Sequence, residues 1–260
     1  MHHWLALLLC TVLFGTQLPG CSSVNKTVDR SLEVTTGAYK KYINRDPSVD
    51  LEQGVGCSSD EFTAARTFMP VDSELGRLVR VQFDKDTYPP ENWMRMVLDQ
   101  FTWLNGVMVT DSRGEVLARR PSASIKSPDL QLILDQDIDW THGTIHWFLQ
   151  ENDLGPEFVL VSPFFKDNEW QGLIVSYFDF RSLAGLSPNP QSMVAFSPGS
   201  MLWTGRHSDL ETEILSRDWD GLLKDKVQGR LELDNGSFLW LTRYIGEKPL
   251  IYAVKCTGEE

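Results

Sequence analysis

Two histidines and two aspartates near the middle of the chain are of the residue types that bind metal ions. Asp137 and Asp139 precede His142 and His146, and the two histidines are four residues apart, a spacing that ligates metal on a helix. The intervening residues 143–145, a glycine and two β-branched residues, favour a strand, on which the histidines are too far apart to share an ion. We expect no metal site. The acids are compatible with glycoside hydrolysis or with a solvated edge, and their spacing does not distinguish the two.

Other enzyme motifs are missing from the sequence. It contains no glycine-rich phosphate loop and no G-x-S-x-G elbow, and only three histidines follow residue 20. The sequence therefore gives no indication of a complete hydrolase catalytic triad. We expect no catalytic residues, no enzymatic activity and no cofactor.

An apolar segment lies near the start of the chain. Residues 4–14 (WLALLLCTVLF) are apolar without interruption, enough for a signal-peptide core but short of the roughly 20 residues that span a membrane. The sequence Leu-Pro-Gly-Cys at 18–21 resembles the lipobox of bacterial lipoproteins. This resemblance implies cleavage before Cys21 and a lipid on its thiol, and the two serines that follow favour the outer membrane. Histidines at positions 2 and 3, where lysine or arginine is usual, depart from the pattern.

Two further cysteines, Cys57 and Cys256, form a candidate disulfide in a chain exported to a compartment that can be oxidising. Their bridge would close a loop of nearly the whole processed chain, worth up to about 5 kcal/mol if it is unstrained. Two unpaired thiols are the alternative in a reducing exterior. Mass spectrometry with and without reductant separates the two.

Composition limits the classes of partner. The net charge is −12, and none of the charged residues lies within residues 1–20. Such an acidic surface argues against nucleic acid as a partner, because phosphates are bound by clustered Lys and Arg. A hydrophobic content of 42%, with nine Trp and thirteen Phe, is enough for well-filled cores in one large domain or two small ones.

Helices are expected mainly before residue 102. Apolar residues at helical spacing predict an amphipathic helix over 26–45, followed by a turn-rich acidic loop over 46–59. Short helices are predicted at 60–68 and 73–83. A helix at 91–101 is indicated more strongly, because two prolines precede an acidic first turn.

An internal repeat follows the helical part of the chain. Residues 106–120 and 193–204 both have the pattern of a β-hairpin. A polar cap residue and an apolar helical stretch follow each hairpin, beginning at 127–130 and at 208–210. Strands end both copies, and the apolar segments align in the same order: 158–165 with 238–245, and 173–177 with 250–254. Two α+β domains of unrelated origin could share this pattern of strands and helices, but the consistent order of hairpin, helix and strands favours a duplicated module.

Each copy thus has an antiparallel sheet with a helix between its second and third strands, which resembles the PAS-like modules of the Cache superfamily. The resemblance is sharpest at 102–116 (TWLNGVMVTDSRGEV) and 172–180 (GLIVSYFDF). It implies an α+β fold of two PAS-like modules, each an antiparallel sheet with flanking helices, preceded by a long N-terminal helix. The expected boundaries are a signal peptide at 1–20, the anchor with helical and loop segments at 21–88, a membrane-distal module at 89–186, and a smaller module at 187–260.

The resemblance also implies a ligand site in the distal module. Asp179 stands where the family has the carboxylate that receives a ligand ammonium, and Trp140 where it has a pocket tryptophan. Ile138 and Thr141 stand where the family's neighbouring Arg and Tyr would be, so a cationic or amine ligand is expected more than a zwitterion. The alternative is that Trp140 is a core residue and Asp179 caps a helix. The expected ligand-binding residues are Trp140, Asp179, Trp147, Tyr177 and Arg120.

Two functions remain open. The first is a lipid-anchored, periplasm-facing sensor of a small ligand, an amine, amino acid or other metabolite, that signals through an envelope protein partner. The second is an interaction or scaffold lipoprotein of the envelope that uses the same fold without a small ligand. The equivalent of Asp179 in the second module is Cys256, so that module is expected to bind no ligand.

Overall fold

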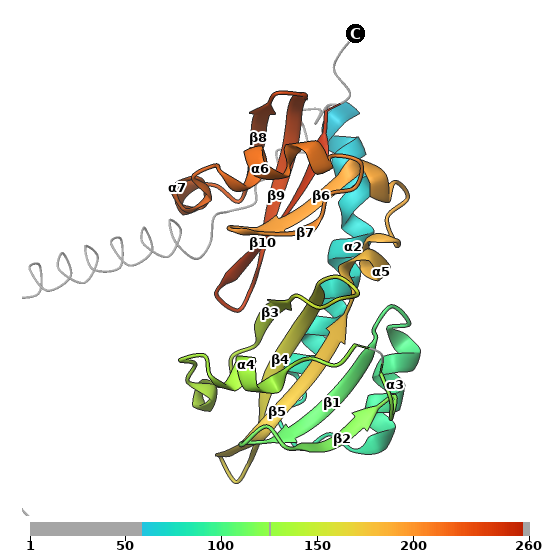
Figure 1. The fold of residues 1–260 in the computed structure, drawn as a ribbon, viewed down its shortest axis with the longest axis vertical. Coiled ribbons are helices and arrows are strands. Elements are labelled where there is room, and N and C mark those ends of the chain that lie inside the picture. Colours follow the sequence, from blue (N-terminus) through green and yellow to red (C-terminus); the bar gives the residue numbers. More distant parts are fainter. Residues whose placement is uncertain (1–58, 125, 257–260) are drawn as a thin grey trace, which may run out of the picture. The chain divides into compact units, whose positions relative to one another are not determined.

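The computed structural model describes residues 59–124 and 126–256, which form two five-stranded antiparallel sheets with flanking helices (Figure 1). The first sheet follows two helices, α2 (Ser59–Phe83) and α3 (Glu91–Gln100). Its strands are β1 (Gly106–Asp111), β2 (Val116–Arg120), β3 (His146–Gln150), β4 (Glu157–Lys166) and β5 (Glu169–Phe178). The strands of the second sheet are β6 (Met193–Ser197), β7 (Ser200–Trp203), β8 (Gln228–Leu233), β9 (Gly236–Ile245) and β10 (Lys248–Lys255).

The two sheets have the same topology. Their strand orders are β2-β1-β5-β4-β3 and β7-β6-β10-β9-β8, so each hairpin, each central strand and each edge strand has its counterpart. Both modules place helices between their second and third strands: α4 (Leu130–Leu134) in the first, and α6 (Glu211–Leu215) with α7 (Trp219–Asp225) in the second. The α+β fold class, the internal repeat and the hairpins at 106–120 and 193–204 are therefore confirmed.

The helix α2 corrects one sequence prediction. Residues 60–68 and 73–83 were expected to form two short helices, but the structure has one continuous helix with Pro70 inside it. Apolar side chains on both sides of the proline, including Phe68 and Leu75, are buried in the same core, and this packing outweighs the hydrogen bond that proline removes. The helix predicted at 26–45 and residues 46–58 of the loop predicted at 46–59 lie outside the described residues, and Ser59 begins α2.

The helix α2 contacts both sheets, packing against β4 and against β9 and β10. The side-chain amide of Gln82 donates to the carbonyl oxygens of Leu160 (3.1 Å) and Ile174 (2.9 Å) in the first sheet. Asp72 pairs with Arg243 of the second sheet. These polar contacts tie the helix to both sheets, and the two hydrogen bonds satisfy the buried amide donors of Gln82.

Capping differs between the two copies. Asp129 caps α4 by accepting a hydrogen bond from the Gln131 backbone (3.0 Å), as the sequence predicted. In the second copy, Ser208 is the first residue of a 3₁₀ turn, Ser208–Leu210, and caps nothing. The side-chain cap there belongs to Asp218 at the start of α7.

The first sheet separates two cores because successive strand residues point to opposite faces. In β4, Phe158 and Leu160 belong to the larger core, which also contains residues of α2 and of the second sheet. Val159 and Val161 face a smaller core under α4 and the 3₁₀ turn Trp140–His142. The strand β4 is therefore apolar on both faces over residues 158–161, between Glu157, where it begins, and the buried Ser162.

One glycine on β5 sets the spacing of β1 and β5. A Cβ added to Gly172 would lie 1.9 Å from the carbonyl oxygen of Thr110 on β1. We expect Gly172→Ala to lower the free energy of unfolding by about 3 kcal/mol, the upper part of the range for overpacking, because backbone atoms cannot move aside as side chains do. Urea unfolding measures the loss. Gly185→Ala, whose nearest neighbours lie 3.4 Å or more away, is the matched control, and equal effects of the two would contradict the explanation.

Candidate functional site

Asp179 lies at one end of the first sheet, between the end of its central strand β5 and the helix α5 (Phe180–Ala184). Its Oδ1 accepts a hydrogen bond from the backbone N–H of Arg181 (2.9 Å), so it caps this helix. The Arg181 guanidinium also donates to both carboxylate oxygens. The helix-cap alternative for Asp179 is thus observed, and reception of a ligand ammonium stays a prediction.

A buried ammonium, that of Lys126, lies against this carboxylate. Lys126 Nζ donates to Asp179 Oδ2 (3.0 Å) and to the carbonyl oxygen of Gly155 (3.2 Å), and it lies 3.4 Å from Glu157 Oε2. The other oxygen of Glu157 accepts from the Asn105 side-chain amide (2.7 Å). The exposed fractions of the Lys126, Asp179 and Glu157 side chains are 10%, 12% and 2%. We call these four residues, Asn105, Lys126, Glu157 and Asp179, the carboxylate cluster.

The two carboxylates of the cluster differ in pKa. Burial by itself raises the pKa of Asp179, but hydrogen bonds from Arg181 and Lys126 outweigh it and hold the pKa at about 2. Burial raises the pKa of Glu157, and the contacts from Asn105 and Lys126 oppose this only in part. Asp179 is therefore the permanent anion of the cluster, whereas Glu157 takes up a proton more readily than an exposed glutamate.

The carboxylate cluster borders two pockets that are open to solvent. One, of about 400 Å³, is lined by Asn105, Lys126 and Asp179 together with residues of the segment after β2. The other, of about 570 Å³, lies between α4 and β3 and is lined by Glu157 and by apolar residues such as Leu132, Ile133 and Phe148. Charged and apolar groups thus meet at one end of the first sheet, which suits a small amphipathic ligand.

Two of the predicted site residues, Trp140 and Tyr177, belong to the smaller core. The Trp140 side chain is 5% exposed and meets the His146 ring edge-to-face at 5.2 Å. Tyr177 is fully buried, and its hydroxyl has no hydrogen-bond partner among the described residues. Gly106 makes room for this hydroxyl, since a Cβ there would lie 2.3 Å from it. Neither side chain lines the two pockets beside the carboxylate cluster, so the core alternative is observed for Trp140.

The other two predicted residues, Trp147 and Arg120, also line neither of the two pockets beside the carboxylate cluster. Trp147 is buried in the larger core, stacked on Phe158 at 4.7 Å, and its indole N–H donates to the carbonyl oxygen of Lys248 (3.4 Å). Arg120, at the end of β2, forms an ion pair with Glu91 of α3. Of the five predicted site residues, the structure thus places Asp179 at a pocket with buried charges.

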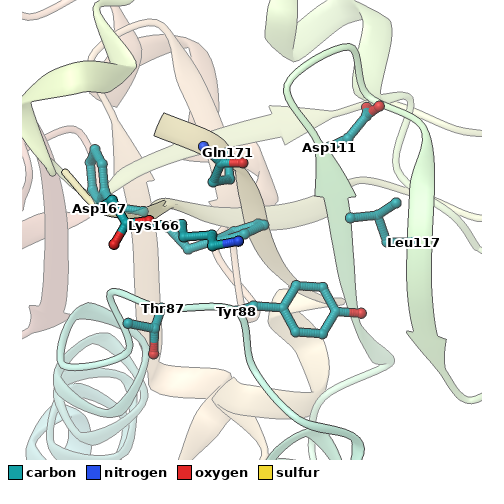
Figure 2. Close-up of a pocket in the computed structure, with 9 residues that line it drawn as sticks. Thr87, Tyr88, Asp111, Leu117, Lys166, Asp167 and Gln171 are labelled. Carbon is teal, nitrogen blue, oxygen red and sulfur yellow. The ribbon is translucent and has the colours of Figure 1, made fainter. Parts of the chain in front are cut away.

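A larger pocket, of about 670 Å³, lies at the opposite end of the same sheet (Figure 2). Tyr88, which packs edge-to-face on Phe164 at 5.7 Å, forms one wall, and Leu117 of β2 another. Its charged residues Asp111, Lys166 and Asp167 are not buried. Because no charge is withdrawn from water there, this pocket gives less basis for specific ligand recognition than the carboxylate cluster does.

The remaining chemical candidates do not assemble into a site. His142 ends a 3₁₀ turn and pairs with Asp139 (3.1 Å), whereas His146 begins β3, so the strand expected at 143–145 begins only at His146. Among the described residues there is no group of three or more potential metal ligands. The Cys256 thiol donates to Ser237 Oγ (3.7 Å). Cys21 and Cys57 lie outside the described residues, so the lipid anchor and the Cys57–Cys256 bridge stay predictions.

Comparison with solved structures finds likenesses of low similarity. The ligand-binding domain of the amino acid chemoreceptor PctB of Pseudomonas aeruginosa PAO1, in complex with L-Gln, is 12% identical over 76% of this chain and 88% of its own, with a TM-score of 0.45. An extracellular ligand binding receptor from Desulfohalobium retbaense DSM5692 is 10% identical, with a TM-score of 0.44. That match covers 75% of this chain but only 38% of the receptor.

A third likeness covers more of both chains. The extracellular domain of the putative histidine kinase vpHK1S-Z8 is 13% identical over 90% of this chain and 92% of its own, with a TM-score of 0.43. No protein-family model and no curated protein matches the chain. Because the TM-scores of these three likenesses lie below 0.5, they carry no argument about function, which has to come from the site itself.

Sequence reasoning missed Lys126, Glu157 and Asn105. Glu157 offered one signal, because a carboxylate at the start of the apolar run FVLVSPFF is a candidate for burial. Lys126 offered none: it lies among serines, 53 residues before its partner Asp179.

In the described part of the chain, no helix is both long and apolar enough to cross a membrane.

Proposed function

We propose that the chain is a lipid-anchored, extracytoplasmic sensor that binds a small amine or amino acid at the carboxylate cluster and signals through an envelope protein partner. The observation that carries the proposal is a pair of buried carboxylates that surround one ammonium beside an open pocket. Asp179, Glu157 and the Gly155 carbonyl together present three acceptors, the number that a primary ammonium can satisfy.

Stability alone does not account for such a cluster. Removing two carboxylates and a lysine from water costs several kcal/mol per ion, and apolar replacements of similar volume are often as stable or more stable. Buried charges with shifted pKa values are instead enriched at sites of binding and catalysis. The position of this cluster, where β5 ends and two pockets meet, supports the binding interpretation.

Calorimetry with a panel of amines, polyamines and amino acids tests the proposal. We expect at least one member to bind, and Asp179→Asn to weaken that binding tenfold or more, because the variant keeps a helix-capping side chain but loses the charge. Asp153→Asn, which removes an exposed charge from the neighbouring loop, is the matched control. Equal affinities for the wild type and Asp179→Asn would remove Asp179 from the site.

An interaction lipoprotein without a small ligand is the second candidate. It is favoured by the same contacts, since the chain's own Lys126 and Arg181 already satisfy the Asp179 carboxylate. A panel in which no compound binds the wild type, together with co-purification of an envelope protein, would support this candidate instead.

The lipid anchor has a direct test. We expect the expressed full-length chain to incorporate labelled palmitate and to sediment with membranes, and Cys21→Ser to abolish both, because the thioether requires the thiol. Cys10→Ser is the control, since that cysteine lies in the segment expected to be cleaved. Membrane association that survives in Cys21→Ser would contradict the proposed lipid anchor on Cys21. The proposed location of the anchored protein is the cell envelope, on the outer membrane.

A further inference from the structure

Lys126 differs from an ordinary surface lysine in what surrounds its ammonium. The Nζ atom meets oxygen atoms from three separate parts of the first module: it donates to Asp179 after β5 and to Gly155 in the loop before β4, and it forms an ion pair with Glu157 at the start of β4. A free alkylammonium would need the same three acceptors. The side chain therefore occupies the position that a ligand's ammonium would take.

The backbone next to Lys126 is held independently of its side chain. Asp129, three residues further on, is bound twice by Gln150 of β3: its backbone N–H donates to Gln150 Oε1 (2.8 Å), and its carbonyl oxygen accepts from Gln150 Nε2 (2.7 Å). The carbonyl oxygen of Lys126 itself accepts from the Ser124 hydroxyl. Because the side chain also lines the 400 Å³ pocket, it can rotate toward solvent without unfolding the strands around it.

We infer that the carboxylate cluster is a self-occupied ammonium site: Lys126 is a tethered competitor, and an external primary amine binds by displacing it. The inference rests on the proposed function, in that both place an ammonium between Asp179 and Glu157. It goes further by making the affinity for amines depend on a competing group of the chain itself. A tethered group competes at high effective concentration, so the intrinsic affinity of the site exceeds the affinity of the wild type.

Truncation of Lys126 tests the inference, with the missing part of the side chain supplied as a free amine. Lys126→Ala lacks three methylenes and the ammonium, which n-propylamine replaces. Lys126→Met keeps the length of the chain but lacks the ammonium, which methylamine or ammonium ion replaces. We expect each amine to raise the Tm of its variant by about 3–6 °C at ten times its Kd, and to leave the wild type almost unchanged at that concentration.

The controls separate this effect from general ones. The exposed Lys224→Ala should not respond to n-propylamine, and n-propanol and tetramethylammonium should not stabilise Lys126→Ala. Adding Asp179→Asn to either Lys126 variant should abolish the response, because the carboxylate that holds the ammonium is gone. Lys126→Met preserves the packing of the alkyl chain, so the test does not depend on the folding of the alanine variant.

The outcomes for the inference and for the proposed function are distinct. If neither Lys126 variant responds to its amine, Lys126 is a structural ion-pair partner and the inference is overturned, whatever the wild type binds. If the variants respond while the wild type binds no amine of the panel, the self-occupied site stands and the amine ligand of the proposed function fails. If a panel amine binds the wild type through Asp179 and binds Lys126→Ala at least tenfold more tightly, both stand.

Discussion

Asp179→Ala is expected to lower the free energy of unfolding by about 3–5 kcal/mol, the cost of breaking a buried ion pair by removing one partner. The variant leaves the Lys126 ammonium, 10% exposed, with a neutral carbonyl and a carboxyl group of raised pKa as its remaining acceptors. It also removes the cap of α5, which contributes about 1 kcal/mol. Urea unfolding followed by tryptophan fluorescence at pH 7 measures the loss.

Two further variants separate the charge from the cap. Asp179→Asn keeps a capping side chain, so its loss reflects the charge alone, and it should be smaller than that of Asp179→Ala. Lys126→Met combined with Asp179→Ala should recover much of the stability, because no buried ammonium is then left without its partner. Asp153→Ala, in the exposed loop nearby, should change stability by less than about 0.5 kcal/mol. A loss below 1 kcal/mol in Asp179→Ala would show that the Lys126 ammonium reaches water.

The charge component also has a definite pH dependence. The pKa of Asp179 is about 2 in the folded protein, below the value of about 3.9 for an exposed aspartate. Its ionised form therefore stabilises the fold fully above about pH 5, and this contribution is lost as the pH falls through 4 toward 2. The difference in stability between the wild type and Asp179→Asn should shrink over that range. A constant difference from pH 7 to pH 2.5 would contradict the lowered pKa.

Phe158→Ala is expected to cost about 3–5 kcal/mol, the range for deleting a buried phenylalanine side chain. The ring is fully buried and stacks on both Trp147 (4.7 Å) and Phe178 (4.8 Å). Its loss leaves a cavity that the surrounding strands cannot close, because β4 is paired on both sides, with β3 and β5. Chemical denaturation at pH 7 measures the change.

The matched control for this variant is another phenylalanine. Phe62 of α2 is 61% exposed, so Phe62→Ala should change stability by less than about 0.5 kcal/mol. Phe158→Leu, which keeps most of the volume, should lose much less than the alanine variant. Similar losses in Phe158→Ala and Phe62→Ala would mean that the stacked rings contribute little to the core.

The elements that were predicted correctly are those whose signals are local. The hairpin at 106–120 has turn residues between two apolar segments, and the helix predicted at 91–101, observed at Glu91–Gln100, follows two prolines. In both cases a short window of sequence contains the physical cause. The continuity of α2 through Pro70 is not local. It depends on the burial of Phe68 and Leu75 against strands that follow much later in the chain.

The residues of the candidate site also divide into those that the sequence indicated and those that only the tertiary structure revealed. Asp179 was singled out because the resemblance implies a ligand-binding carboxylate at this position, and its place just before a predicted helix offered a cap as the alternative. Trp140 and Trp147 were equally conspicuous, but aromatic side chains fill cores as well as pockets, and the structure places both in cores. The residue type alone does not determine which face of a sheet a side chain meets.

By itself, the sequence determined the duplicated α+β architecture and the order of strands and helices within each copy, because periodicity and turn chemistry are properties of neighbouring residues. Its export signal and the lipid anchor at Cys21 remain predictions of the same local kind. Only the tertiary structure decided that Lys126, Glu157 and Asp179 form one cluster. The β4–β5 hairpin brings Glu157 and Asp179 together, whereas Lys126 reaches them from a segment 53 residues before Asp179. A contact between residues so far apart in the sequence leaves no trace in the local pattern of the chain.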